Sequence, residues 1–166
     1  MLPGEARPGS VYASRSREAW TSPGAGRVAS DRVTTVLVAT DAEWIFDDVD
    51  AALADESTQV YRVRSGRDVQ PACEQVRPDV VVLDLQIGNS GGVATSVGLR
   101  QDQDMGRLPP FKVVMLLDRM ADVFMAQMAR ADGWLVKPLD AIRLRRAVKR
   151  VLSGESYHEG MLDHAG

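Results

Sequence analysis

Residues 77–85 read Arg77-Pro78-Asp79-Val80-Val81-Val82-Leu83-Asp84-Leu85, an apolar run that ends in a carboxylate. The residues from 80 to 83 are all apolar, so this segment has no polar face and predicts a strand buried on both sides. Such strands are typical of parallel sheets, which helices cover on both faces. The run therefore indicates an α/β domain and places Asp84 at the carboxyl end of a central strand.

The chain on either side of this run alternates between strand-like and helical patterns. Further short apolar runs predict strands at 35–39, 59–63, 111–117 and 133–136. Apolar residues at helical spacing predict helices at 41–53, 68–76, 93–100, 118–130 and 140–152. Five β-α units in series predict a three-layer, doubly wound α/β fold with a five-stranded parallel sheet.

Several side chains receive a purely structural interpretation. Asp41 is the predicted N-cap of the helix over 41–53. Phe124 and Met128 are expected to pack on the core from the helix over 118–130, and Met120 and Met125 are expected to fill core space.

Composition divides the chain into three parts. Gly, Pro, Ser and Ala make up 17 of residues 1–32, which predicts a disordered N-terminal tail because such a segment buries too little apolar surface to offset its ordering entropy. Residues 33–152 form the predicted domain, and residues 153–166 are expected to be a flexible C-terminal tail.

Charge and cysteine content exclude several classes of protein. The net charge is −3 and aromatic residues make up 5% of the chain, so a general nucleic-acid-binding surface is not expected. One cysteine, Cys73, cannot form an internal disulfide. No apolar run is long enough to cross a bilayer, and no signal peptide is visible. We therefore expect a cytoplasmic protein that binds neither membrane nor nucleic acid directly.

Charged residues follow the predicted strands at the edge where ligands bind such sheets. Asp41 follows the first strand, Asp84 ends the third, Asp118 ends the fourth, and Lys137 ends the fifth. Carboxylate oxygens suit Mg²⁺, and a nearby lysine neutralises phosphoryl charge. An aspartate flanked by a metal and a lysine is a credible phosphoryl acceptor. The alternative interpretation is that these residues are merely strand-end caps.

Four stretches resemble the receiver domain of two-component response regulators, and together they span about 120 residues: Val36 to Asp41, Arg77 to Leu85, Gly91-Gly92, and Ala131 to Pro138. The resemblance implies a flavodoxin-like (βα)5 fold, with Asp84 as phosphoacceptor. It also implies Mg²⁺ on Asp41, Asp84 and the backbone carbonyl of Gln86, a phosphate contact from Lys137, and a cis bond before Pro138.

Three departures from the family pattern weaken the expected switch. Thr40 stands where the family usually has a second acid, so weak Mg²⁺ binding is expected. Leu117 stands where a Ser or Thr hydroxyl usually bonds the phosphoryl group. Trp134 replaces the mobile Tyr or Phe, so the usual coupling between phosphate and aromatic rotamer is not expected.

Two hypotheses of different class follow. The first is a stand-alone receiver, not an enzyme, that takes a phosphoryl group from a histidine kinase or phosphotransfer protein and signals to an unknown downstream protein. The second is a phosphorylation-independent pseudo-receiver that acts as an interaction module. Gln86 disfavours a third, a small phosphatase. The last helix offers a predicted partner surface, with homodimerisation as one use: Arg143, Arg146 and Lys149.

Overall fold

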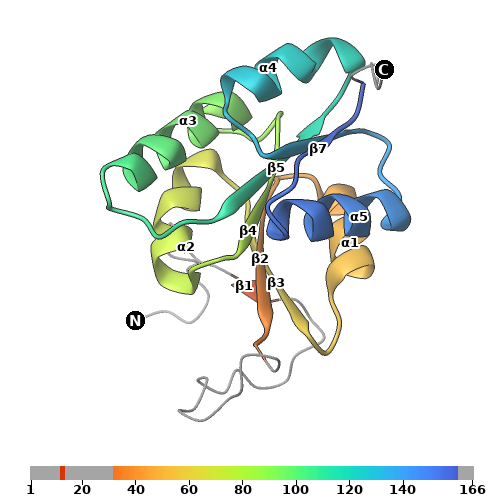
Figure 1. Cartoon of the computed structure of the whole chain (residues 1–166), viewed down its shortest axis with the longest axis horizontal. Coiled ribbons are helices and arrows are strands. Elements are labelled where there is room, and N and C mark those ends of the chain that lie inside the picture. Colours follow the sequence, from red (N-terminus) through yellow and green to blue (C-terminus); the bar gives the residue numbers. More distant parts are fainter. Residues whose placement is uncertain (1–11, 14–31, 161–166) are drawn as a thin grey trace, which may run out of the picture.

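The computed structural model of the chain describes residues 12–13 and 32–160. In that part, seven strands form one sheet in the order β1-β3-β2-β4-β5-β6-β7 (Figure 1). The strands are β1 Tyr12–Ala13, β2 Thr34–Ala39, β3 Thr58–Val63, β4 Val80–Asp84, β5 Lys112–Leu117, β6 Gly133–Val136 and β7 Tyr157–His158. β2 to β7 are parallel, and β1 is antiparallel to β3 at one edge.

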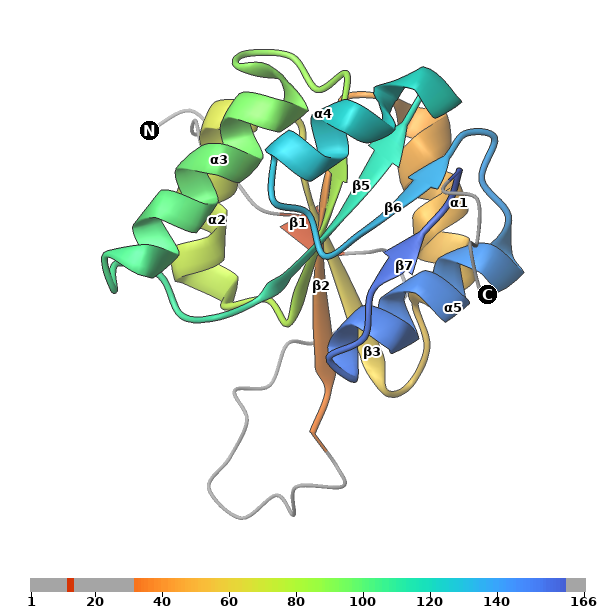
Figure 2. The same cartoon turned by 45° about the horizontal axis from the view of Figure 1, so that its top comes forward.

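Helices cover both faces of the sheet. The α-helices are α1 Glu43–Leu53, α2 Val69–Val76, α3 Gly91–Asp104, α4 Val123–Met128 and α5 Ala141–Leu152. Short 3-10 turns precede two of them, η2 Gly66–Asp68 and η3 Met120–Asp122. Helices α1 and α5 lie on one side of the sheet, and α2, α3 and α4 lie on the other (Figure 2). None of the helices within residues 32–160 is long and apolar enough to span a membrane.

The central strand shows why the sheet is covered on both sides. All five residues of β4 are buried, and their side chains alternate between two apolar clusters. Val81 and Leu83 pack with residues of α2, α3 and α4, whereas Val80 and Val82 pack with residues of α1 and α5. The predicted three-layer, doubly wound fold is therefore confirmed, and each of the five predicted strands is present. The predicted number of strands is wrong, because β1 and β7 add one strand at each edge of the sheet.

The prediction of a flexible C-terminal tail is wrong for residues 153–160. Tyr157–His158 form β7, which pairs with Gly133 and Trp134 of β6. A Cβ on Gly133 would lie 3.0 Å from the Tyr157 carbonyl oxygen, so the missing side chain at Gly133 lets the segment approach. This contact involves residues distant in sequence, and no periodicity within 153–166 signals it. Residues 161–166 lie outside the described residues.

At the other end, the predicted tail over 1–32 contributes one edge strand. Tyr12 pairs with Arg62, and Ala13 pairs with Tyr61 of β3. Arg32 donates to Asp79 at 2.6 Å. The rest of the predicted tail, 1–11 and 14–31, lies outside the described residues.

Two side-chain expectations are also wrong. Phe124 and Met128 are 64% and 56% exposed, because α4 has only six residues and buries a small one, Ala126. Met120 and Met125, which were expected to fill core space, are likewise exposed, at 58% and 40%. Helix α1 begins at Glu43 with Ala42 as N-cap and no side-chain cap bond, so Asp41 does not cap it.

Candidate functional site

Asp84 is the last residue of β4, and its carboxylate is buried at the carboxyl edge of the sheet. The residue is 1% exposed. The parallel register of β2, β4, β5 and β6 brings the ends of these four strands together around it.

Lys137, directly after β6, makes the charged contact to Asp84. Its Nζ donates to Asp84 Oδ1 at 2.7 Å and to Asp118 Oδ1 at 2.9 Å. Burial alone would lower the pKa of the Lys137 ammonium, but the two carboxylates outweigh it and raise that pKa. The ammonium is thus a fixed cation shared between two acids.

Asp118 is the functional candidate to which sequence reasoning assigned no separate role. It follows β5 directly, and its position at a strand end was the available signal. Burial raises its pKa, but the hydrogen bond from Lys137 prevails and lowers it below the ordinary value. An ionised Asp118 carboxylate thus shares the Lys137 ammonium with Asp84. We call the site formed by Asp84, Lys137, Asp118 and Thr40 the Asp84 pocket.

The Thr40 hydroxyl binds the second carboxylate oxygen of Asp84. Its Oγ1 donates to Asp84 Oδ2 at 2.7 Å and accepts from the Ala42 backbone N–H at 3.1 Å. The Thr40 residue is fully buried. Position 40 therefore carries no acid that could add charge for binding a metal. Instead, the neutral Thr40 hydroxyl donates a hydrogen bond to the Asp84 carboxylate.

The donor set for a divalent cation is correspondingly small. The exposed Asp41 accepts from the Gly88 backbone N–H at 3.3 Å, and the Gln86 backbone N–H donates to Asp84 Oδ1 at 3.0 Å. Within residues 32–160, no three His, Cys, Asp or Glu side chains are grouped so that they could hold a metal ion. These residues do not form a strong cation site by themselves.

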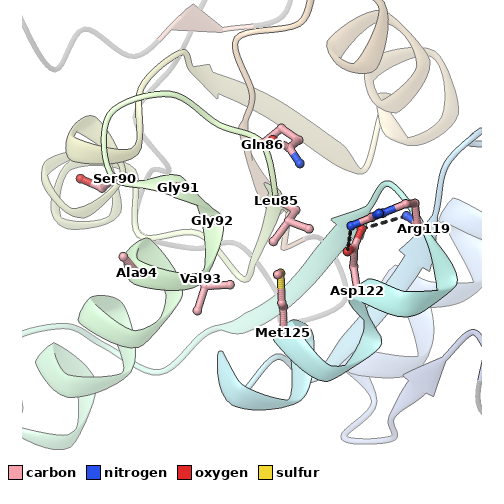
Figure 3. Close-up of a pocket in the computed structure, with 10 residues that line it drawn as sticks. All are labelled: Leu85, Gln86, Ser90, Gly91, Gly92, Val93, Ala94, Arg119, Asp122 and Met125. Atoms are coloured by element: carbon pink, nitrogen blue, oxygen red, sulfur yellow. Dashed lines mark hydrogen bonds and ion pairs between the residues drawn. The ribbon is translucent and has the colours of Figure 1, made fainter.

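A separate cavity of about 430 Å³ lies beyond the end of β4, where Leu85 and Gln86 line it, between the start of α3 and η3-α4. Leu85 and Met125 point toward one another across it, and Arg119 pairs with Asp122 at its rim (Figure 3). A Cβ on Gly92 would lie 2.8 Å from the Asp84 carbonyl oxygen. Only a glycine there lets the first turn of α3 lie so close to the end of β4.

The two expected switch positions are both buried. Leu117 is fully buried at the end of β5 and carries no hydroxyl. Trp134 is 2% exposed, and its ring stacks on His158 with centroids 3.9 Å apart. Its indole N–H donates to the Glu159 carbonyl oxygen at 2.8 Å. The Lys137–Pro138 peptide bond is cis.

The predicted partner surface on α5 is not uniform. Arg146 and Lys149 are exposed. The Arg143 guanidinium instead binds the Glu159 carboxylate and two backbone carbonyls, so Arg143 does not lie free on the surface. Glu159 was missed by sequence reasoning because it falls in a segment with no periodic pattern.

Comparison with known proteins assigns this fold to one family. The family model described as response regulator receiver domain matches residues 36–149, which is more than half of the chain. The chain belongs to this receiver domain family. The family is a signalling module of phosphorelay systems, and its members characteristically bind Mg²⁺ at the phosphorylation site.

Curated relatives of this receiver domain are response regulators. The response regulator protein VraR of Staphylococcus epidermidis is 30% identical over 97 residues, which cover 57% of this chain and 44% of the relative. The nitrate/nitrite response regulator protein homolog of Haemophilus influenzae is 31% identical over 103 residues, covering 62% and 48%. The chain thus spans less than half the length of the curated relatives it matches.

A solved structure agrees with the fold. The signal receiver domain of a signal transduction histidine kinase from Syntrophus aciditrophicus is 26% identical, with a TM-score of 0.63. The match covers 74% of this chain and 92% of that one.

Proposed function

We propose that this receiver domain accepts a phosphoryl group on Asp84 from a histidine kinase or phosphotransfer protein and signals by protein contact. The observation that carries the proposal is the Lys137 ammonium 2.7 Å from Asp84 Oδ1 on a carboxylate that is 1% exposed. A fixed cation neutralises charge that develops on a transferring phosphoryl group.

The proposed step uses the carboxylate as nucleophile. An Asp84 oxygen forms a bond to phosphorus while the bond from phosphorus to the donor atom breaks, and its electron pair leaves with the donor. Oδ1 already accepts from Lys137 and the Gln86 amide, whereas Oδ2 accepts from the Thr40 hydroxyl. Oδ2 is therefore the better nucleophile, since a neutral donor withdraws less charge from it.

Magnesium would bind this pocket weakly. Its ligands would be the carboxylates of Asp41 and Asp84 and the backbone carbonyl of Gln86. Thr40 removes the further acid, and affinity for a divalent cation depends on the charge of its ligands. The phosphoryl step above is not routed through the cation.

A phosphorylation-independent interaction module is the second candidate. It is favoured by the Thr40 hydroxyl, which satisfies Asp84 Oδ2 without a metal, and by the apolar side chain of Leu117. In this case the fold serves as a docking module, and Asp84 is a structural acid that anchors Lys137.

Intact-mass analysis after incubation with acetyl phosphate and Mg²⁺ separates the two candidates. We expect a gain of one phosphoryl group in the wild type and none in Asp84→Asn, which keeps the side-chain size. A stable gain that survives Asp84→Asn would show that another residue is the acceptor. No gain in either protein, with acetyl phosphate or with a histidine-kinase donor, would leave the interaction module as the function.

A further inference from the structure

The backbone on both sides of Lys137 is held by two side chains from outside the Asp84 pocket. The Val136 N–H donates to Glu159 Oε2 at 3.0 Å. The Arg143 guanidinium donates to the carbonyl oxygens of Val136 and Pro138, each at 2.9 Å. Three hydrogen bonds thus fix the segment whose middle residue carries the ammonium.

Arg143 and Glu159 also bind one another through two atoms each. Arg143 Nε lies 2.7 Å from Glu159 Oε1, and Nη2 lies 2.5 Å from Oε2. The side chain of Glu159 is 18% exposed and that of Arg143 is 31% exposed. A bidentate guanidinium–carboxylate pair fixes the plane of both groups. We call this pair, together with its bonds to residues 136 and 138, the backbone clamp.

The strand β7 determines where Glu159 lies. Tyr157 and His158 pair with Gly133 and Trp134, and the Trp134 indole bonds the Glu159 carbonyl. The stack of His158 on Trp134, with an interplanar angle of 11°, fixes the same register. The Glu159 side chain therefore meets Val136, which is the residue before Lys137.

We propose that Glu159 is a positioning residue for the Asp84 pocket. Through Arg143 and the Val136 amide it holds the 136–138 backbone, and that backbone aims the Lys137 ammonium between Asp84 and Asp118. Glu159 lies outside residues 36–149, the part that matches the family model. The consequence for phosphorylation rests on the proposed function.

Losing the Glu159 carboxylate leaves the Val136 N–H without its acceptor and leaves Arg143 with Asp140, 3.2 Å away, as its carboxylate partner. Lys137 then samples orientations away from Asp84, and misplacement of a catalytic group by about 1 Å can cost on the order of a hundredfold in rate. Because the strand pairing of β6 still restrains Lys137, we expect a smaller effect, roughly a tenfold slower phosphorylation of Asp84.

The test compares five full-length variants with the wild type. Glu159→Ala removes the carboxylate, and Glu159→Gln keeps a hydrogen-bond acceptor for Val136 but not the charge for Arg143. Arg143→Ala removes the other half of the clamp. Glu155→Gln is the matched control, since Glu155 is exposed on the same segment. The double variant of Arg143 and Glu159 closes a double-mutant cycle.

Two readouts are measured for each protein. The first is the NMR signal of the Lys137 ammonium in the absence of any phosphoryl donor. The second is the rate of phosphoryl gain from acetyl phosphate, followed by intact mass. We expect the Lys137 signal to shift and the rate to fall about tenfold in Glu159→Ala and Arg143→Ala, with an intermediate effect in Glu159→Gln. The phosphorylation rate of the double variant should fall no further than that of either single variant. Glu155→Gln should match the wild type in both readouts.

An unchanged Lys137 signal in Glu159→Ala and Glu159→Gln overturns the proposal, as does a wild-type phosphorylation rate in both. If Glu159→Ala does not fold, Glu159→Gln and its Lys137 signal decide the matter. If the wild type takes up no phosphoryl group, the proposed function fails, while the Lys137 signal still shows whether Glu159 positions the ammonium.

Discussion

At the scale of single residues, the hydroxyl of Thr40 does what a bound cation would do for Asp84, because it supplies the donor that the buried oxygen needs. We predict that Thr40→Asp makes the stability of the domain depend on Mg²⁺. Without metal, a second carboxylate faces Asp84, and the lost hydrogen bond and added repulsion should lower the free energy of unfolding by about 1–3 kcal/mol. Excess Mg²⁺ should restore much of that loss, because a ligand of the folded state stabilises it.

Urea unfolding with EDTA and with excess Mg²⁺ measures this effect. Thr40→Val is the matched control, since it removes the hydroxyl and adds no charge. It should lose stability and gain no response to Mg²⁺. A response in Thr40→Asp that is no larger than in the wild type would show that residue 40 does not face the cation.

Sequence reasoning located residues of the pocket because their positions follow from local patterns. Asp84 and Lys137 each end a strand whose apolar run is visible in the sequence, and parallel strands bring such ends together. The sharing of Lys137 between Asp84 and Asp118 was not predictable. It depends on side-chain rotamers at adjacent strand ends, and these follow from packing and not from periodicity.

At the scale of elements, β7 shows where the sequence is uninformative. A two-residue strand has no period, and β7 is fixed by the space above Gly133 and by the ring of Trp134. Helix α4 shows the same limit, because the apolar residues Phe124 and Met128 fit a helical pattern and yet face solvent. Periodicity reports that a helix has an apolar side, but the length and tilt of the helix decide what that side contacts.

The stack of His158 on Trp134 predicts a pH dependence of stability. His158 is exposed overall, but partial desolvation of its ring disfavours the charged imidazolium and lowers the pKa of His158 below its ordinary value. The unfolded chain then binds a proton more readily than the folded one, so this contribution is fully present above the unfolded pKa of about 6.5 and is lost as pH falls below it. We therefore expect the free energy of unfolding to fall between about pH 7.5 and 5.5.

His158→Phe isolates this contribution, because phenylalanine keeps an aromatic ring on Trp134 and does not titrate. Urea unfolding should show a smaller loss over this pH range in His158→Phe than in the wild type. His164→Phe, which removes the other histidine of the chain, is the control and should keep the wild-type dependence. Equal losses in the wild type and His158→Phe would mean that other groups cause the effect.

At the scale of the whole molecule, the question is whether a phosphoryl group on Asp84 changes the surface formed by residues 118–160. A phosphoryl group shifts a conformational equilibrium only through contacts that differ between the two states. Leu117 offers it no hydrogen bond, which is worth about 0.5–1.5 kcal/mol net for a typical pair. Trp134 is held by His158 and by the Glu159 carbonyl, so its ring is not free to change rotamer in a close-packed site.

We therefore predict nearly the same surface with and without phosphate. Hydrogen exchange of residues 118–160 should agree within a few-fold between untreated protein and protein loaded with beryllofluoride as a phosphoryl mimic, and a partner that binds Arg146 and Lys149 should not distinguish them. The Asp84→Asn variant under the same conditions corrects for effects of the reagent away from Asp84. A protection change beyond about tenfold, or roughly 1.4 kcal/mol, would show that the domain switches by a route other than the strand-end hydroxyl and the aromatic ring.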